Sequence, residues 1–209
     1  MKNNTNIRRS IRLKNYDYSQ DGYYFITICV QNRAFMFGEI ENGKIILTDI
    51  GILAKQHWMD IPNHYNNILL DEYIIMPNHI HGIIGINNTE NICRGVALQR
   101  TMIQERSMIQ MQPTSIHKQP ISKVVASNDP TIKNEYMSSI SPKQGTLSAI
   151  IRSYKSGVTK QLHNDGFIGP IWQSKYYDHI IRNEVELNKI REYIVNNPAN
   201  LEYDELYIK

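Results

Sequence analysis

His79 and His81, two histidines in alternate positions, are the residues whose types and spacing point most directly to chemistry. In an extended segment alternate side chains project from one face, so the two imidazoles would lie together while Ile80 points the other way. Two neutral imidazoles side by side supply half of a typical four-ligand metal site. They would equally suit the solvent face of a half-buried strand. A partner elsewhere in the chain must decide between these interpretations.

A candidate partner lies near the end of the sequence. Asn183, followed three residues later by Glu186, resembles the capping box that begins a helix. Apolar residues then recur at helical spacing until Pro198 ends the pattern. Tyr193 and Asn197 are four residues apart and are therefore neighbours on one face of the predicted helix. This helix would present a phenol and an amide oxygen together.

These two motifs together resemble the HUH single-tyrosine transposases, the insertion-sequence-200-like family, and within it the REP-associated tyrosine transposases. The resemblance is carried by the histidine pair after Met76-Pro77-Asn78 and by the later Tyr-x-x-x-Asn-Pro motif that begins at Tyr193. It also takes in segments 8–18, 23–29, 150–155 and 171–183. It covers the chain except for the middle.

The resemblance implies a role for each of four residues. His79 and His81 would be metal ligands, Tyr193 the nucleophile, and Asn197 the residue that completes the metal site from the helix. Better-known relatives carry Gln at that last position, so Asn offers the same amide oxygen on a side chain shorter by one methylene. The implied reaction leaves a 5′-phosphotyrosine and a free 3′-hydroxyl on single-stranded DNA, and its reversal joins a different end without a nucleotide cofactor.

The expected chemistry also has a basis in general principles. A divalent cation on a phosphodiester neutralises charge that repels a nucleophile and stabilises the transition state. Imidazole and amide donors suit Mg or Mn in the cell, so we expect Mg or Mn as the cofactor. A tyrosine ester conserves the bond energy for rejoining, although a phenol of pKa about 10 needs help to lose its proton. The sequence shows no evident base for that step.

Other residues and other classes of protein compete with this interpretation. The chain has thirteen tyrosines, of which Tyr154, Tyr176 and Tyr177 lie beside basic residues, and His179 is a backup ligand or base. A histidine-triad hydrolase would need a third alternate histidine where Ile83 stands, and a two-histidine phosphoesterase would need a His-x-Thr pair, which the sequence lacks. A catalytically inactive DNA hairpin-binding protein of the same fold is the main alternative function.

Length and composition agree with an intracellular single-domain enzyme. The 209 residues and a hydrophobic share of 41% suffice for one domain with a sizeable core. Two cysteines make no disulfide framework. No apolar stretch approaches the roughly 20 residues of a membrane helix, and the N-terminus lacks a signal-peptide core, so we expect a cytoplasmic protein with no membrane partner.

The formal net charge is only +3, but the basic residues are unevenly placed. They gather before the first acidic residue, Asp17, and again before the predicted tyrosine helix. Aromatic residues are interleaved with the second group, which favours single strands because unpaired bases stack on aromatic rings. The predicted DNA-binding residues are Arg8, Arg9, Arg12, Lys14, Arg152, Lys155, Trp172, Lys175 and Arg182. The expected partner is single-stranded DNA with a hairpin.

The order of predicted elements indicates an α+β fold. We expect strands at 23–30, 39–46, 68–76 and 79–86, and helices at 49–60, 146–162 and 184–197. The family resemblance implies a ferredoxin-like sandwich, with helices packed on a central antiparallel sheet. Residues 1–86 and 146–209 would form a single transposase catalytic domain, interrupted by a polar insertion or linker at 87–145. The sequence leaves open whether two subunits of a homodimer exchange the tyrosine helix.

Overall fold

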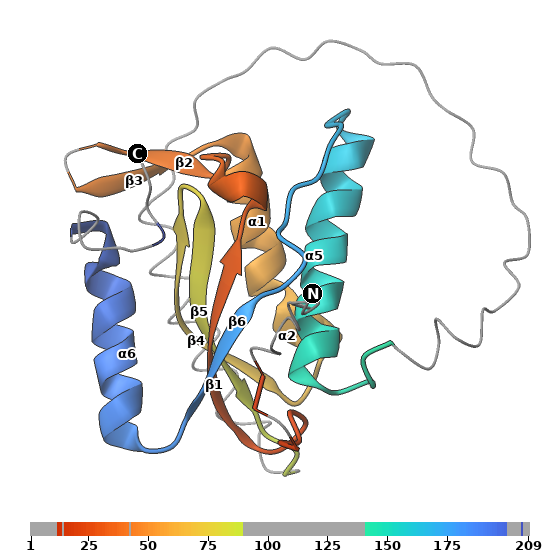
Figure 1. Cartoon of the computed structure of the whole chain (residues 1–209), viewed down its shortest axis with the longest axis vertical. Coiled ribbons are helices and arrows are strands. Elements are labelled where there is room, and N and C mark those ends of the chain that lie inside the picture. Colours follow the sequence, from red (N-terminus) through yellow and green to blue (C-terminus); the bar gives the residue numbers. More distant parts are fainter. Residues whose placement is uncertain (1–11, 14, 42, 90–140, 200–205, 207–209) are drawn as a thin grey trace, which may run out of the picture.

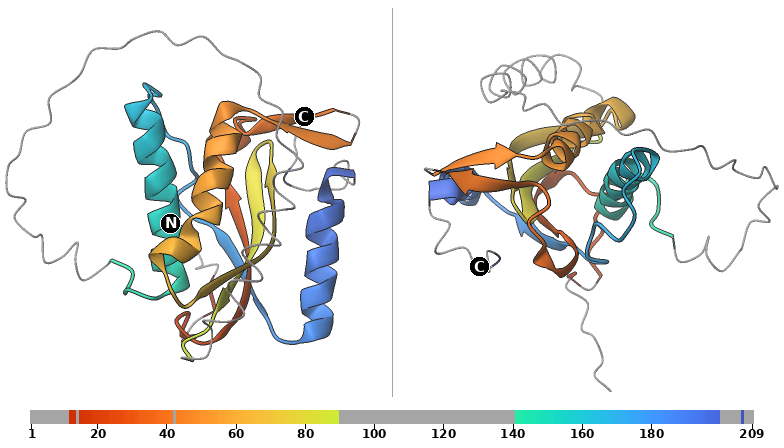
Figure 2. Two further views of the ribbon diagram at one scale, coloured as in Figure 1. Left: turned by 180° about the vertical axis from the view of Figure 1, so that it is seen from behind. Right: turned by 90° about the horizontal axis from the view of Figure 1, so that it is seen from above.

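The computed structural model describes residues 12–13, 15–41, 43–89, 141–199 and 206 of the chain. Figures 1 and 2 show their arrangement. In chain order the elements are β1 (Gly22–Cys29), the single 3-10 turn η1 (Gln31–Arg33), β2 (Gly38–Glu41), β3 (Lys44–Leu47), α1 (Asp49–Met59), α2 (Ile61–His64), β4 (Ile68–Met76), β5 (His79–Ile86), α5 (Leu147–Asn164), β6 (Tyr177–Ile181) and α6 (Glu184–Asn196).

Four strands form one antiparallel sheet in the order β4-β5-β1-β6. Apart from the β2–β3 hairpin and the short turns, the chain enters this sheet as β1-α1-β4-β5-α5-β6, the β-α-β-β-α-β order of ferredoxin-like domains. Helices α1 and α5 cover one face of the sheet, and α6 lies on the other (Figures 1 and 2). The predicted α+β fold, an antiparallel sheet with helices packed on it, is confirmed.

The main core lies between the sheet and helices α1 and α5. Alternate residues of β1, among them Tyr24, Ile26 and Ile28, are completely buried on this face. Trp58 of α1 packs against the central strand β5, where Gly82 leaves room for the indole: a methyl group at position 82 would overlap the ring. This contact sets how closely α1 approaches the sheet.

A smaller core lies under α6 on the opposite face. Leu187 and Ile194 of α6 are buried against Ile83 of β5 and Ile181 of β6. These residues confirm that the apolar stripe of the predicted helix faces the protein. Because Ile83 and the two histidines alternate along β5, they all face α6.

The start of α6 follows the sequence expectation in part. The Asn183 side chain accepts a hydrogen bond of 2.9 Å from the Glu186 backbone N–H, as an N-cap should. The Glu186 carboxylate, however, accepts from the backbone N–H of Arg182 and from the His179 ring rather than completing a capping box. These two donors lower the pKa of Glu186, the backbone N–H of Arg182 having the larger effect.

Two strand expectations differ from the structure. Segment 39–46, predicted as one strand, belongs to the β2–β3 hairpin, which turns through Gly43 at a φ of 72° that favours glycine. Strand β6 was not predicted, because Asp178 and His179 interrupt any apolar alternation. Among the described strands β6 lies at the edge of the sheet, next to β1, and two of its five side chains, Tyr177 and His179, are exposed.

The other predicted strands and helices are confirmed, with ends that shift by one or two residues. The predicted insertion at 87–145 lies for the most part outside the described residues, so the domain division stays a prediction. Among the helices that the structure describes, none is long and apolar enough to cross a membrane.

Candidate active site

The two histidines lie on β5, whose eight residues are all buried. His79 is completely buried and His81 is 2% exposed. Their Nε2 atoms face each other at 3.0 Å, and their ring centroids are 4.5 Å apart. The period of the strand therefore brings the two imidazoles together on the face covered by α6, in the arrangement expected from their spacing.

Each histidine has a partner for its other ring nitrogen. His81 Nδ1 lies 2.9 Å from the Thr27 hydroxyl, directly across the β1–β5 ladder. His79 Nδ1 lies 2.7 Å from Oδ1 of the preceding residue, Asn78. Such contacts fix the orientation of an imidazole and the position of its proton. Both Nε2 atoms are thereby directed to the same point.

Tyr193 reaches this point from α6. Its hydroxyl lies 3.3 Å from Nε2 of His81, although the two residues are 112 positions apart in the chain. Phe25 of β1 positions both rings: it stacks on the His81 imidazole at 5.2 Å and meets the Tyr193 ring edge to face at 6.0 Å. Tyr193 is 46% exposed, so part of the residue faces solvent.

Asn197, at the end of α6, is only 3% exposed. Its Oδ1 is buried and has no hydrogen-bond partner among the described residues. A buried amide oxygen without a donor is costly, and such atoms call for an explanation. Coordination of a cation would provide one.

The donors present fit a divalent cation. In the part of the chain that the structure describes, no group of three or more His, Cys, Asp or Glu side chains could hold a metal. A third protein donor to a cation beside His79 and His81 would therefore be another kind of group, such as the buried amide oxygen of Asn197. Two nitrogens 3.0 Å apart, each about 2.1 Å from an ion, subtend about 90° at it, the angle between neighbouring ligands of an octahedral ion.

The predicted DNA-binding residues of the N-terminal segment lie mostly outside the described residues. This holds for Arg8, Arg9 and Lys14. The guanidinium of Arg12 lies over the ring of Tyr176 at 4.9 Å, and its Nε is 3.9 Å from Asp178 Oδ1. Arg12 thus packs against the body of the protein near β6.

The second predicted basic group does not reach the imidazole pair through any described contact. Lys155 of α5 donates from Nζ to the backbone carbonyls of Gln173 and Lys175. Burial lowers the pKa of Lys155 to about 8. The Trp172 indole donates to the Lys155 carbonyl and packs against Phe37. Lys155 and Trp172 therefore hold the loop before β6 against α5.

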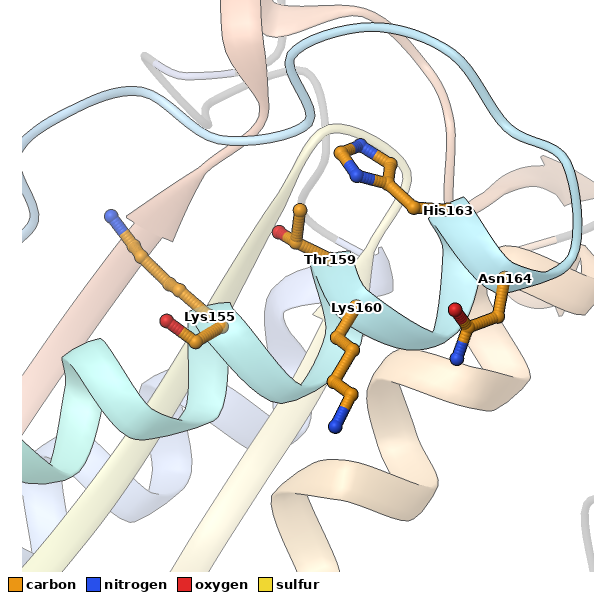
Figure 3. A pocket seen from close by; sticks show the side chains of 6 residues that line it. Lys155, Thr159, Lys160, His163 and Asn164 are labelled. Carbon is orange, nitrogen blue, oxygen red and sulfur yellow. The ribbon is translucent and has the colours of Figure 1, made fainter. Parts of the chain in front are cut away.

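Arg152, Lys175 and Arg182 are exposed and available to a partner. Arg152 lies on α5 and donates to the Ser141 hydroxyl, whereas Arg182 lies between β6 and α6. Figure 3 shows an open pocket along α5, lined by Lys155, Ser156, Thr159, Lys160, His163 and Asn164. This pocket contains none of the residues of the imidazole and tyrosine site. The DNA-binding roles stay predictions.

Three contributors to the site were missed in the sequence. Asn78 was detectable, because an amide directly before a histidine pair can hold the first ring. Thr27 and Phe25 were not, because only the register of β1 against β5 places them beside His81. Their alternation along β1 indicates a shared face, but a single sequence does not reveal the opposite strand.

Comparison with known proteins identifies one relative in sequence. An uncharacterized protein of Haemophilus influenzae is 36% identical over 201 residues, which cover 96% of this chain and 93% of the relative. Identity at this level over nearly the whole length shows common descent. The chain belongs to the same family as the Haemophilus influenzae protein. No family model matches the sequence.

Among solved structures, a REP-associated tyrosine transposase bound to a REP hairpin has the same fold. Its TM-score is 0.51 at 13% sequence identity, covering 92% of this chain and 74% of the transposase. A candidate transposase from Deinococcus radiodurans matches at 14% identity over 88% of this chain and 95% of its own, with a TM-score of 0.34 that is too low to bear on the fold.

Proposed function

We propose that this protein cleaves and rejoins single-stranded DNA, with Tyr193 as the nucleophile and His79, His81 and Asn197 as ligands of Mg or Mn. The observation that carries the proposal is the 3.3 Å approach of the Tyr193 hydroxyl to Nε2 of His81. A tyrosine nucleophile and a metal ligand must both reach one phosphate, which requires this proximity. It brings together two motifs that are 112 positions apart in the chain.

The reaction can be written with a complete balance. The Tyr193 oxygen attacks phosphorus, a tyrosine O–P bond forms, and the bond to the 3′ oxygen of the preceding nucleotide breaks. The phenol loses a proton and the departing 3′ oxygen gains one. Attack of a 3′-hydroxyl on the phosphotyrosine reverses these changes, so rejoining requires no nucleotide cofactor. A bound divalent cation would neutralise phosphate charge and stabilise the transition state.

The residues of the chain have distinct tasks in this scheme. Tyr193 is partly exposed, so a strand of DNA would approach it from solvent. Phe25 holds the Tyr193 ring beside the imidazole of His81. Because these contacts all form within one chain, they support a site that needs no tyrosine helix from a second subunit.

We further propose single-stranded DNA that carries a hairpin as the substrate. Exposed Arg152, Lys175 and Arg182, together with the basic N-terminal segment, would bind phosphates. The solved transposase of similar fold is bound to a REP hairpin, which supports this class of partner. Sequence-specific contacts to such a hairpin would set where the strand is cut.

A covalent trap tests the proposal. A pool of hairpin oligonucleotides with randomised single-stranded flanks and a 3′ fluorescent label is incubated with the full chain and Mn²⁺, and adducts are separated under denaturing conditions. Because the 5′ phosphate stays on tyrosine, the labelled 3′ fragment should travel with the protein. EDTA should abolish the adduct.

Tyr193→Phe removes only the hydroxyl and should bind the pool without forming an adduct. Tyr177→Phe is the matched control, because Tyr177 is 45% exposed and Tyr193 46%; it should form the adduct as the wild type does. Binding of the pool by the wild type without any adduct would refute the proposed activity and favour an inactive hairpin-binding protein.

A further inference from the structure

Five residues, the two histidines among them, form one continuous chain of hydrogen bonds. Thr27 Oγ1 lies 2.9 Å from Nδ1 of His81, whose Nε2 lies 3.0 Å from Nε2 of His79. His79 Nδ1 lies 2.7 Å from Asn78 Oδ1, and Asn78 Nδ2 lies 2.9 Å from the Leu206 carbonyl oxygen. The four side chains are at most 6% exposed. The direction of these bonds decides which ring nitrogens carry protons.

The direction is fixed at the Asn78 end. The carbonyl of Leu206 can only accept, so the Asn78 amide nitrogen must face it and donate. This orientation turns Asn78 Oδ1 to His79, and an amide oxygen also can only accept. His79 therefore carries its proton on Nδ1, and Nε2 of the neutral ring has a lone pair.

The remaining bonds follow from this assignment. Two lone pairs facing each other at 3.0 Å would repel, so His81 must donate from Nε2 to Nε2 of His79 when no cation is present. Nδ1 of a neutral His81 is then an acceptor, and the Thr27 hydroxyl donates to it. Every donor in this chain of hydrogen bonds then has an acceptor. The Tyr193 hydroxyl, 3.3 Å from His81 Nε2, is compatible because a phenol can donate or accept.

Binding of a cation by both Nε2 atoms requires a different state of His81. Its proton must leave Nε2 and reside on Nδ1, and the Thr27 hydroxyl must turn from donor to acceptor. The proton count and the net charge of the ring stay the same. A hydroxyl can serve in both states because it has one proton and two lone pairs.

We propose that Asn78 and Thr27 are positioning residues that control the tautomers of the two histidines. Asn78 holds His79 in the Nδ1–H tautomer, whereas Thr27 lets His81 change from Nε2–H without a cation to Nδ1–H with one. The inference rests on the metal ligands of the proposed function and adds the residues that prepare them for a cation.

Nitrogen-15 NMR of the histidine rings in the full chain reads each tautomer directly. Without metal, His79 should be protonated at Nδ1 and His81 at Nε2; with saturating Mg²⁺, both should be protonated at Nδ1. Asn78→Leu removes the acceptor and should let His79 populate the Nε2–H form, whereas Asn78→Asp keeps an acceptor and the Nδ1–H form. His79 protonated at Nε2 in the metal-free wild type would overturn the inference, as would a doubly protonated His81.

Variants at Thr27 test the second half of the inference by Mn²⁺ affinity, measured from the electron paramagnetic resonance signal of free Mn²⁺. Thr27→Val has nearly the same shape but leaves the Nδ1–H of metal-bound His81 without an acceptor, so it should weaken Mn²⁺ binding about 10- to 100-fold. Thr27→Ser keeps the hydroxyl and should restore most of the affinity. Thermal unfolding verifies that both variants fold.

The outcomes separate this inference from the proposed function. Wild-type Mn²⁺ affinity in Thr27→Val would overturn the role of Thr27, even if DNA cleavage is normal. Failure of the wild type to bind either cation would overturn the His81 change together with the metal ligands of the proposed function. Correct tautomers and the expected Thr27 effect without a Tyr193 adduct would support the inference and refute only the nuclease activity.

Discussion

The guanidinium of Arg191 makes two hydrogen bonds to the carboxylate of Asp71, of 2.8 Å from Nε and 2.6 Å from Nη2. Asp71 of β4 lies on the face that α6 covers, because it alternates with Leu70, which faces the main core. The Asp71 hydrogen bond raises the pKa of Arg191 above its ordinary value. This ion pair fastens the tyrosine helix to the sheet of its own chain.

We predict that Arg191→Gln lowers the free energy of unfolding by about 2 kcal/mol, because the largely buried Asp71 carboxylate loses its charged partner. The measurement is urea unfolding. Lys189→Gln removes an exposed cation from the same helix and should change the free energy of unfolding by less than about 0.5 kcal/mol. Equal effects of the two variants would show that the ion pair does not hold α6.

A methyl group at Gly82 should destabilise the main core. Gly82→Ala would press against the Trp58 indole, and we expect a loss of about 1 to 3 kcal/mol in the free energy of unfolding. The smaller ring of Trp58→Phe should make room, so the double variant should be less destabilised than the sum of the single variants. If the losses of the two single variants simply add up in the double variant, the two residues are not in contact.

Metal affinity should rank the proposed ligands. His81→Ala removes an imidazole nitrogen and should weaken Mn²⁺ binding more than Asn197→Ala, because the amide oxygen is the weaker donor and its side chain is short. Isothermal titration calorimetry with Mn²⁺ measures both, and binding of the hairpin pool should persist in each variant. A larger loss for Asn197→Ala would make the amide the principal ligand.

The pH dependence of stability should reveal the half-buried Lys155. Its pKa is about 8 in the folded chain against an ordinary value of 10.5, so between these values the unfolded chain binds more protons. Burial of the charged amine therefore destabilises the folded chain fully below about pH 8. This penalty shrinks as the pH rises from 8 to 10.5, and it is absent above pH 10.5. Lys155→Met removes that dependence.

The measurement is the difference in unfolding free energy between Lys155→Met and wild type at pH 7 and at pH 10.5. The unfolding free energy of Lys155→Met, relative to that of wild type, should be higher at pH 7 than at pH 10.5. Lys160→Met changes an exposed lysine of the same helix and should show the same difference from wild type at both pH values. A constant difference for Lys155→Met would contradict the lowered pKa.

The sequence was sufficient to predict elements with a strong local pattern. The capped helix α6 and the buried strand β5 carry their apolar spacing within a few residues, so their positions and faces followed directly. Strand β6 was missed because its pairing with β1 stabilises a segment of weak local pattern. The β2–β3 hairpin was merged into one strand because its turn is short.

The candidate site was predictable where a motif lies in one segment and not where tertiary contacts create it. His79, His81, Tyr193 and Asn197 could each be selected from local spacing. The 3.3 Å approach of Tyr193 to His81 depends on the packing of α6 across the sheet, and the pairing of Arg191 with Asp71 joins positions 120 apart in the chain. Among the basic residues, charge alone did not separate Lys155, which is half-buried, from exposed Lys175.

Mass spectrometry of the covalent adduct tests the central claim most directly. The wild-type chain is incubated with the hairpin pool and Mn²⁺, digested with nuclease and protease, and searched for a peptide that carries a nucleotide. We predict one modified residue, Tyr193, joined to the 5′ phosphate of the downstream fragment. A nucleotide on Tyr154, Tyr176 or Tyr177 with unmodified Tyr193, or a linkage to a 3′ phosphate, would contradict the account.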